Sequence, residues 1–315
     1  MGEKLPKVVI VAGPTASGKS DLALALAEEF AGVVINADSQ QRYRDFPILT
    51  AQPSDAERAR APHRLFGDLE ANDVSTAAEW AAKAALDVRT AHAGQQLPIV
   101  VGGTGLYLKV LMEGVAEIPR VPDEIRTAAR TMLTDIGNAD FHRLLAERDP
   151  ESASRIPPGN TQRLARAWEV VEATGTALSV WQEAPARPAL AADYFCILVM
   201  PPREAVVEAG AARFRAMLKA GALGEVEAAL RKGIAPDAPA MHALGARELA
   251  GHLAGRMSLA EAVNLADIAT RQYAKRQATW FRHQFNSDVT QEARYTSQMR
   301  AALVSRVRDF LKESS

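Results

Sequence analysis

The chain has 315 residues, enough for one large domain or two modest ones, with 48% hydrophobic residues, 24% charged residues and a formal net charge of −1. This composition fits a soluble globular protein, and no apolar run reaches the ~18–20 residues that a membrane span needs. The single cysteine, Cys196, excludes an internal disulfide framework and a cysteine-rich zinc site, so we expect a reducing, cytoplasmic setting.

Short apolar runs predict buried strands, and longer stretches rich in alanine and leucine between them predict helices. The strands are expected at 8–12, 33–36, 97–101 and 194–199, and the first helices at 20–30 and 76–91. Strands that are separated by helices are typical of a parallel sheet. We therefore predict an α/β fold in which a parallel sheet is flanked by helices.

The region between the third and fourth expected strands is punctuated by prolines and is otherwise helical. Its helices are expected at 123–135, 140–147 and 161–174. We predict that residues 117–186 form a helical insertion domain, and that the α/β core comprises residues 1–116 and 187–315. After Pro202 we expect helices to the end of the chain, apart from a turn-rich loop at 233–239.

A phosphate-binding motif, G-x-x-x-x-G-K-[S/T], follows the first expected strand and opens the first expected helix. It comprises Gly13, Pro14, Thr15, Ala16, Ser17, Gly18, Lys19 and Ser20. The backbone N–H groups of such a loop and the positive end of the helix favour phosphate oxygens. Lys19 adds a point charge, and Ser20 offers a hydroxyl to Mg²⁺. The motif predicts a phosphate-binding enzyme, which could be a kinase, an ATPase or a transferase with a diphosphate leaving group.

Asp38 follows the second expected strand, and the turn at 102–107 follows the third, so both should lie at the edge of the sheet that carries the phosphate loop. Asp38 could act there as a general base or as a ligand of Mg²⁺, or it could simply cap a turn or a helix. The glycines of the turn allow a ligand to approach the backbone closely, and Thr104 supplies a hydroxyl or caps the next helix. The residues alone leave these alternatives open.

The charge of the chain is distributed unevenly. Residues 1–195 carry 20 lysines and arginines against 26 acidic residues, whereas residues 196–315 carry 17 against 12. A basic C-terminal part permits nucleic-acid binding without requiring it, and a solvated helical surface is the alternative. One helical stretch combines cations with aromatic residues, namely Arg271, Tyr273, Lys275, Arg276, Trp280 and Arg282. It could contact RNA, or it could be a packing helix whose cations reach the solvent.

Seven motifs occur in order over nearly the whole chain. They are G-P-T-A-S-G-K-S, N-A-D-S-x-Q-x-Y-R-D, L-T-A-Q-P, A-P-H-R-L, V-G-G-T-G-L-Y, Q-R-L-x-R-A-x-E-V and T-R-Q-Y-A-K-R-Q-x-T-W-F-R. Together they resemble the tRNA dimethylallyltransferases, also called the IPP transferase family. The resemblance implies a P-loop NTPase-like parallel sheet. It also implies transfer of a dimethylallyl group from dimethylallyl diphosphate to N6 of adenine 37 in tRNAs that read codons beginning with U, with Mg²⁺ assisting.

The resemblance also implies roles for individual residues. Asp38 is the base for the adenine amine, Thr104 helps at the amine and the leaving group, and Arg213 contacts the diphosphate, which lies on residues 15–20. The adenine is expected to flip out of the anticodon loop to reach the site. The partner is the anticodon stem-loop of tRNA, bound by a monomer. The implied tRNA contacts are Asp38, Ser39, Gln40, Gln41, Thr104, Arg126, Gln162, Arg163, Leu164, Ala165, Arg166 and Arg247.

The chain departs from the family pattern at a few positions. Arg42 stands at a usually apolar place close to Asp38, so we expect the local packing to be disturbed. Ala209 and Gly210 stand where the family often has arginine and isoleucine ahead of Arg213. Two alternative functions stay open, a small-molecule P-loop kinase and a non-catalytic RNA-binding protein that retains the phosphate loop.

Overall fold

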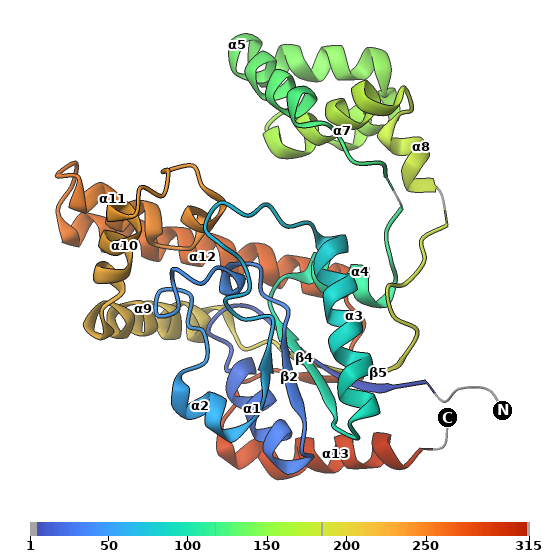
Figure 1. The fold of residues 1–315 in the computed structure, drawn as a ribbon, viewed down its shortest axis with the longest axis vertical. Coiled ribbons are helices and arrows are strands. Elements are labelled where there is room, and N and C mark those ends of the chain that lie inside the picture. The colour runs from blue at the N-terminus through green and yellow to red at the C-terminus, as the bar shows by residue number, and fades with distance from the viewer. Residues whose placement is uncertain (1–4, 117, 184, 314–315) are drawn as a thin grey trace. The chain divides into compact units, whose positions relative to one another are not determined.

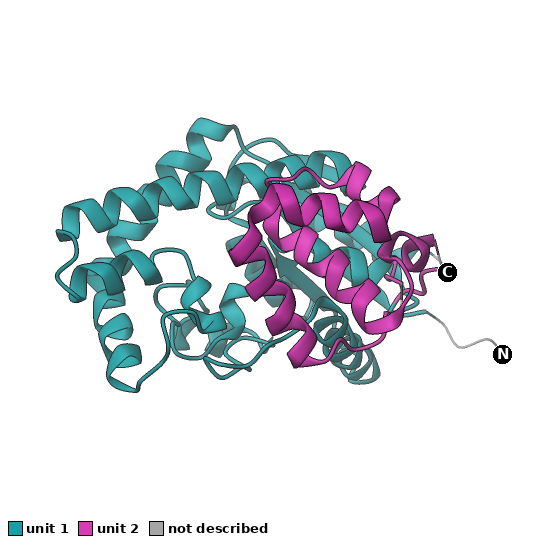
Figure 2. Cartoon of the chain, turned by 90° about the horizontal axis from the view of Figure 1, so that it is seen from above, with its two compact units in different colours: residues 1–112, 189–315 teal, residues 113–188 magenta. Residues whose placement is uncertain are grey.

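The computed structural model describes residues 5–116, 118–183 and 185–313 (Figure 1). The chain separates into two compact units, which Figure 2 shows in different colours. The core unit comprises residues 1–112 and 189–315, and the insertion unit comprises residues 113–188. Each unit contains a hydrophobic cluster of its own.

The core unit contains a parallel sheet with six strands in the described residues, in the order β3-β2-β4-β1-β5-β6. The strands are β1 (Lys7–Ala12), β2 (Val33–Asn36), β3 (His63–Arg64), β4 (Pro98–Gly102), β5 (Asp193–Val199) and β6 (Val289–Gln291). The four expected strands are present and every pairing is parallel, which confirms the predicted α/β fold. The edge strands β3 and β6 are too short to form an apolar run, so the sequence pattern does not reveal them.

The central strand β1 shows why its sequence is a continuous apolar run. Val9 pairs with Ile99 of β4 on one side and with Phe195 of β5 on the other. Residues 8–12 are all buried, so neither face of the strand meets water. A strand that is buried on both faces does not alternate between apolar and polar residues.

The core unit also contains the helices α1 (Lys19–Glu29), α2 (Asp55–Arg60), α3 (Ala77–Ala93), α4 (Gly105–Met112) and α13 (Arg300–Lys312). Of these, α1, α3 and α13 pack against this sheet, whereas α2 contacts α1 and α4 contacts α3. Val9 and Val11 join side chains of α1 and α13 in one hydrophobic cluster. Trp80 of α3 is fully buried, and its indole N–H donates a hydrogen bond to Asn36 O at 2.8 Å. This bond fixes the end of β2, where the candidate base follows.

Beyond β5 the chain is mainly helical. It forms α9 (Arg203–Ala220), α10 (Ala222–Arg231), α11 (Ala246–Leu253) and α12 (Leu259–Gln284). The expectation of helices to the end of the chain is wrong at β6, which pairs with β5. Asp288 anchors this pairing, because its carboxylate accepts a hydrogen bond from Cys196 N at 2.7 Å and its N–H donates to Cys196 O at 2.9 Å. None of the helices in the described ranges is both long and apolar enough to cross a membrane.

The insertion unit is helical in its described residues. Its helices are α5 (Asp123–Arg148), α6 (Pro150–Arg155), α7 (Thr161–Thr174) and α8 (Leu178–Glu183). The helices expected at 123–135 and 140–147 both lie in α5, which has a kink at Gly137, where φ is 77°. Apolar residues of α5 and α7 form the core, including Phe141 and Trp168 with ring centroids 5.4 Å apart.

Cys196 lies in the middle of β5 and is buried. Burial raises the pKa of its thiol to about 12, and the nearby Asp288 carboxylate acts in the same direction. A thiol with such a pKa stays protonated at neutral pH, and the thiolate is the reactive form of cysteine. Cys196 is therefore a small core residue, as its position in a strand predicts.

Candidate active site

The candidate active site lies where β1, β2 and β4 end. Because these strands are parallel, the loops that follow them meet at the same edge of the sheet. Residues of α9 and α12 complete a pocket at this edge. Its lining includes Thr15, Lys19, Ser20, Asp38, Arg213 and Tyr273. The fold thus brings together candidate residues that lie almost 200 residues apart in the chain, as Thr15 and Arg213 do, with a separation of 198.

The phosphate loop connects β1 to α1. Gly18 has a φ of 89°, a left-handed conformation that favours glycine, and α1 begins at the next residue, Lys19. The Lys19 side chain is buried, and its Nζ donates a hydrogen bond to Pro14 O at 3.2 Å. Burial lowers the pKa of Lys19 to about 8, although the Asp38 carboxylate acts to raise it. A buried cation that is only partly compensated favours an anionic ligand.

Two hydroxyls of the loop are suited to phosphate oxygens or to Mg²⁺. Ser17 Oγ is buried and has no hydrogen-bond partner in the described residues, which is unusual for a buried hydroxyl. Ser20 is exposed and lines the pocket beside Lys19. The described residues contain no group of three His, Cys, Asp or Glu side chains that could hold a metal by themselves. This donor set fits Mg²⁺ that is bound largely through substrate phosphates and water.

Asp38 is held in the pocket by Asn36, the last residue of β2. The N–H of Asp38 donates to Asn36 Oδ1 at 2.8 Å, and Asn36 Nδ2 donates to Asp38 O at 2.9 Å. The carboxylate oxygen Oδ1 of Asp38 accepts a hydrogen bond from Gln40 N at 3.0 Å. Asp38 therefore caps the turn that follows β2, and the same side chain lines the pocket. Asp38 can therefore cap this turn and also act on a ligand in the pocket.

Thr104 connects the loop after β4 to the segment that carries Asp38. Its Oγ1 accepts a hydrogen bond from Ser39 N at 3.0 Å and donates one to Ser39 Oγ at 3.3 Å. Its N–H donates to Ala37 O at 3.1 Å. The hydroxyl of Thr104 is therefore fixed beside the candidate base.

Two glycines of the turn at 102–107, Gly103 and Gly105, allow a close approach of a helix of the protein. A Cβ atom on Gly103 would lie 2.2 Å from Gln277 Nε2. A Cβ atom on Gly105 would lie 2.1 Å from the ring of Trp280. Both partners belong to α12, so Gly103 and Gly105 let α12 pack directly on the turn, and the approach of a ligand to this turn stays a prediction.

Arg213 extends from α9 to the phosphate loop, where its Nη2 donates a hydrogen bond to Thr15 Oγ1. Burial lowers the pKa of Arg213, and the Asp38 carboxylate acts to raise it. Gly210, one of the departures from the family pattern, lies on the same helix, and a Cβ atom there would meet only Thr270 of α12, at 3.4 Å. The glycine thus lies where α9 passes close to α12, and Arg213 still lines the pocket.

Gln277 also belongs to the site, although the sequence does not single it out as a functional residue. It is buried on α12, where its Oε1 accepts a hydrogen bond from Thr15 N and its Nε2 donates one to Gly103 O. Tyr273, one turn earlier, lines the pocket, and burial raises the pKa of its hydroxyl above the usual value. Both residues lie within the last of the seven motifs. The cations of this motif lie on the exposed face of the helix, whereas Gln277 and Tyr273 lie on its inner face.

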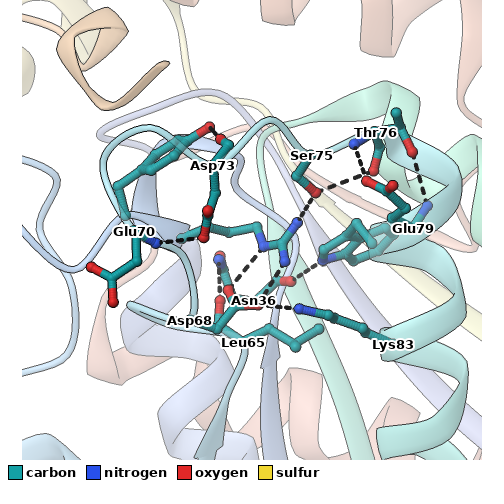
Figure 3. A network of polar contacts seen from close by, with 12 residues as sticks. Asn36, Leu65, Asp68, Glu70, Asp73, Ser75, Thr76, Glu79 and Lys83 are labelled. Atoms are coloured by element: carbon teal, nitrogen blue, oxygen red, sulfur yellow. Dashed lines mark hydrogen bonds and ion pairs between the residues drawn. The ribbon is translucent and has the colours of Figure 1, made fainter. Parts of the chain in front are cut away.

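Arg42 was expected to disturb the packing beside Asp38, and this expectation is wrong. Its side chain is fully buried and donates two hydrogen bonds to the Asp68 carboxylate, from Nε at 2.9 Å and from Nη2 at 2.6 Å. Its Nη1 donates to Ser75 Oγ at 2.5 Å, and Lys83 lies 3.2 Å from the same carboxylate (Figure 3). The partners of Arg42 follow it by 26 and 33 residues, so its neighbours in the sequence do not reveal them.

Gln40 and Gln41, which the resemblance assigns to tRNA, use their amides to hold nearby loops. Gln41 Nε2 donates hydrogen bonds to Thr50 O at 3.0 Å and to Ala51 O at 2.7 Å. Gln40 Oε1 accepts one from Leu244 N at 3.4 Å. Both residues also line the pocket, so they shape the wall of the site.

In the insertion unit the residues assigned to tRNA differ in exposure. Those on α7 are Gln162, Arg163, Leu164, Ala165 and Arg166. The side chains of Leu164 and Ala165 are buried in the core of the unit, so they cannot face a bound RNA. Gln162 and Arg163 are exposed, and Arg166 lies 3.8 Å from the Glu169 carboxylate. Arg126 of α5 is paired with Asp123 at 3.3 Å.

Two helices of the core unit present exposed cations. Arg247 is exposed near the start of α11. On α12 the exposed cations are Arg271, Lys275, Arg276 and Arg282. Arg276 lies over the ring of Tyr273, 5.8 Å from its centroid. This arrangement is compatible with RNA contact and with the alternative of a packing helix whose cations reach solvent.

Comparisons with known proteins agree with one another. The profile of the IPP transferase family matches residues 41–284. The tRNA dimethylallyltransferase of Paramagnetospirillum magneticum is 48% identical over 96% of each chain, and that of Parvibaculum lavamentivorans is 45% identical over 98% of each. The structure of a tRNA delta(2)-isopentenylpyrophosphate transferase from Staphylococcus epidermidis is 29% identical, with a TM-score of 0.67 over 97% of this chain and 99% of its own. A eukaryotic dimethylallyltransferase acting on tRNA is 26% identical, with a TM-score of 0.80 over 97% of this chain and 79% of its own.

Proposed function

The chain belongs to the IPP transferase family, and from this premise we propose that it transfers a dimethylallyl group from dimethylallyl diphosphate to N6 of adenine 37 in tRNA. The acceptors are tRNAs that read codons beginning with U. A bond forms between N6 and C1 of the prenyl group, the bond from C1 to the diphosphate oxygen breaks, and diphosphate leaves. The observation that carries this proposal is that Asp38, Lys19 and Arg213 line one pocket.

The phosphate loop holds the diphosphate of the prenyl donor. Lys19 and Arg213 supply positive charge, which stabilises the transition state as negative charge grows on the leaving group. Lys19 is buried and Arg213 is partly buried, so their attraction for the diphosphate is screened less than it would be in water. The Ser20 hydroxyl lines the same pocket and would hold Mg²⁺, which would supply further positive charge for the leaving group.

Asp38 acts as the general base. An adenine amine is a weak nucleophile because its lone pair is delocalised into the ring, so a proton must leave N6 as the new bond forms. Asn36 holds the backbone of Asp38, and Gln40 N holds its Oδ1, so the carboxylate is presented in a fixed position. Thr104, whose hydroxyl is bonded to Ser39 next to Asp38, helps to orient the amine.

The partner is the anticodon stem-loop of tRNA, from which adenine 37 flips into the pocket. Exposed arginines such as Arg163 and Arg247 contact phosphates, and such contacts position an RNA without reading its sequence. Gln40 and Gln41 affect tRNA binding indirectly, because they hold the loops that form the wall of the pocket. The protein works as a monomer in the cytoplasm, where its substrates are found.

Incubation of the protein with labelled dimethylallyl diphosphate, Mg²⁺ and unmodified tRNA tests the proposal. Label should enter tRNA without ATP, and it should be found on N6 of adenine 37 after digestion to nucleosides. The kinase alternative finds no support in the comparisons, and it requires ATP-dependent phosphorylation of a small molecule with no label in tRNA. Tight binding of tRNA without turnover would support the non-catalytic alternative instead.

A further inference from the structure

The side-chain amide of Gln277 joins the two loops on which the proposed reaction depends. Gln277 belongs to α12 and is only 6% exposed. Its Oε1 accepts a hydrogen bond from Thr15 N at 2.8 Å, and its Nε2 donates one to Gly103 O at 2.9 Å. Because a backbone N–H can only donate and a carbonyl can only accept, these partners fix which end of the amide faces which loop.

The two partners of Gln277 belong to opposite sides of the proposed chemistry. Thr15 lies in the phosphate loop and accepts a hydrogen bond from Arg213 through its Oγ1. Gly103 directly precedes Thr104, whose hydroxyl is bonded to Ser39, the neighbour of the base. One side chain therefore connects the side that holds the leaving group to the side that holds the base.

The turn at Gly103 packs closely on the amide of Gln277. A Cβ atom on Gly103 would lie 2.2 Å from Gln277 Nε2, well inside contact distance. One turn later on α12, Trp280 packs on Gly105 with equal closeness, at 2.1 Å from a Cβ atom there. One turn earlier, Tyr273 lines the pocket. The helix is thus fitted to the site over about two turns, from Tyr273 to Trp280, with Gln277 between them.

We propose that Gln277 is a positioning residue for the diphosphate. Its amide holds the peptides of Thr15 and Gly103 at a fixed separation, so that the phosphate loop and the Thr104 turn keep the geometry that binds the leaving group. Without the amide, two buried backbone groups lose their partner and the loop can take other orientations. The inference rests on the proposed function for the identity of the substrate. The contact of the Gln277 amide with Thr15 and Gly103, here called the Gln277 clamp, acts on any diphosphate in the loop.

A residue that only fills the core would behave differently from a positioning residue. Replacing a packing residue lowers the free energy of unfolding and leaves the ligand affinity of the folded protein unchanged. Replacing a residue that sets the orientation of the loop weakens diphosphate binding in protein that is still folded. The two roles are therefore separated by measuring affinity and unfolding on the same variants.

The variant Gln277→Glu keeps the shape of the side chain. Its carboxylate can still accept from Thr15 N, but it faces the Gly103 carbonyl with no proton to donate, and it adds negative charge near a diphosphate. We expect the affinity for inorganic diphosphate with Mg²⁺, measured by calorimetry at neutral pH, to fall about tenfold. Acidification returns the proton, so the affinity of the variant relative to the wild type should recover as the pH falls. Gln272→Glu makes the same change at an exposed position of α12 and should bind like the wild type.

A second pair of variants tests the same contact from the other side. Gly103→Ala pushes the amide of Gln277 away, and Gln277→Ala removes the amide. If both act on one contact, most of the affinity that Gly103→Ala loses in the wild type should not be lost again in the Gln277→Ala background. The double variant should then bind diphosphate about as weakly as Gln277→Ala alone.

Wild-type affinity for diphosphate in folded Gln277→Glu overturns the proposal, as do additive losses in the double variant. Labelled dimethylallyl diphosphate and tRNA keep the proposed function separate from this result. A wild-type protein that binds diphosphate through Gln277 but labels no tRNA contradicts the proposed function and leaves the clamp intact. A wild-type protein that labels tRNA, with no effect of Gln277→Glu on diphosphate, contradicts only the clamp.

Discussion

The core unit contains buried or partly buried arginines beside exposed ones, whereas none of the described arginines of the insertion unit is buried. In the core unit Arg42 is fully buried against a carboxylate, and Arg213 bonds to the phosphate loop. In the insertion unit Arg143 and Arg155 lie at the surface and pair with acidic residues three or four positions away on the same helix. Arg163 is exposed as well.

This difference separates two uses of one residue type. A buried arginine constrains the structure, because removing it leaves an unpaired charge or an unfilled space. An exposed arginine contributes little to folding, and it can bind a phosphate of a partner without any change in the fold. We therefore expect substitutions of the buried arginines in the core unit to change chemistry or stability, and substitutions of exposed arginines such as Arg163 to change tRNA affinity alone.

The largest expected effect is that of Asp38→Ala, which places the chemistry in the core unit. Removal of a general base should lower the turnover number by about 10²–10⁴-fold, measured with labelled prenyl donor, while tRNA binding measured by filter retention stays nearly intact. Asp38→Asn is the matched control for capping, because an amide oxygen can still accept from Gln40 N but takes no proton from N6. Full turnover in either variant would remove Asp38 from the role of base.

The next largest effect is expected on stability, where a buried ion pair can be compared with an exposed one only two residues away. Arg42→Ala should lower the free energy of unfolding by about 3 kcal/mol, because it leaves a buried space and takes from Asp68 its main partner. Arg44→Ala breaks the pair of Arg44 with Glu70, which is about half exposed, and should cost less than about 1 kcal/mol. Denaturant titration of both variants measures the difference. Equal costs would mean that the burial of Arg42 brings no stability.

The pH dependence of the reaction should reflect the pKa of Lys19, which burial lowers to about 8. Only the protonated lysine attracts diphosphate, so kcat/KM for the prenyl donor should fall about tenfold per pH unit above pH 8. Lys19→Arg, whose guanidinium stays charged, should flatten this limb even if its overall rate is lower. A limb that persists unchanged in Lys19→Arg would assign the titration to another group.

The same shift has a consequence for folding of the free protein. The pKa of Lys19 is lower in the folded chain than its ordinary value of 10.5, so between these values the unfolded chain binds more protons. The contribution of Lys19 to the free energy of unfolding should therefore rise as the pH increases from about 8 to 10.5. Denaturant titrations of the wild type and of Lys19→Met across this window measure it.

The smallest effect belongs to the insertion unit. Arg163→Ala should raise the KM for tRNA about threefold and make the logarithm of affinity depend less steeply on the logarithm of salt, by about 0.7–0.9 per lost phosphate contact. The turnover number and the free energy of unfolding should not change. Arg143→Ala is the control, because Arg143 is exposed in the same unit but is paired with Asp140. The same loss in both variants would indicate a general effect of charge rather than a contact.

The parts of the fold and site that the sequence predicts are those with local signals. The four buried strands and the phosphate loop are each contained in a short run of residues, and Asp38 follows directly from the end of a strand. β6 is not predicted, because its pairing depends on Asp288, which bonds to Cys196 at a distance of 92 residues along the chain. Gln277 is missed for the same reason, since Thr15 lies 262 residues before it.

Two other expectations show how a residue type misleads without its partners. From the sequence, Arg42 is expected to disturb the packing, but in the fold its charge is paired with Asp68 and it also bonds to Ser75. Leu164 and Ala165 belong to a stretch that the resemblance assigns to tRNA as a whole, yet only one face of α7 meets solvent. Resemblance identifies the segment, and helical geometry then decides which side chains in it are available.

The state of Cys196 also makes the protein convenient for spectroscopy. The chain has one cysteine, which is buried in β5, and its thiol has a pKa of about 12. Maleimide dyes react with the thiolate of an accessible cysteine, so the native chain should remain almost unlabelled at neutral pH. A cysteine introduced on the surface of each unit would therefore be labelled selectively. Fluorescence energy transfer between two such positions could then follow the distance between the units as tRNA binds, without first removing a native thiol.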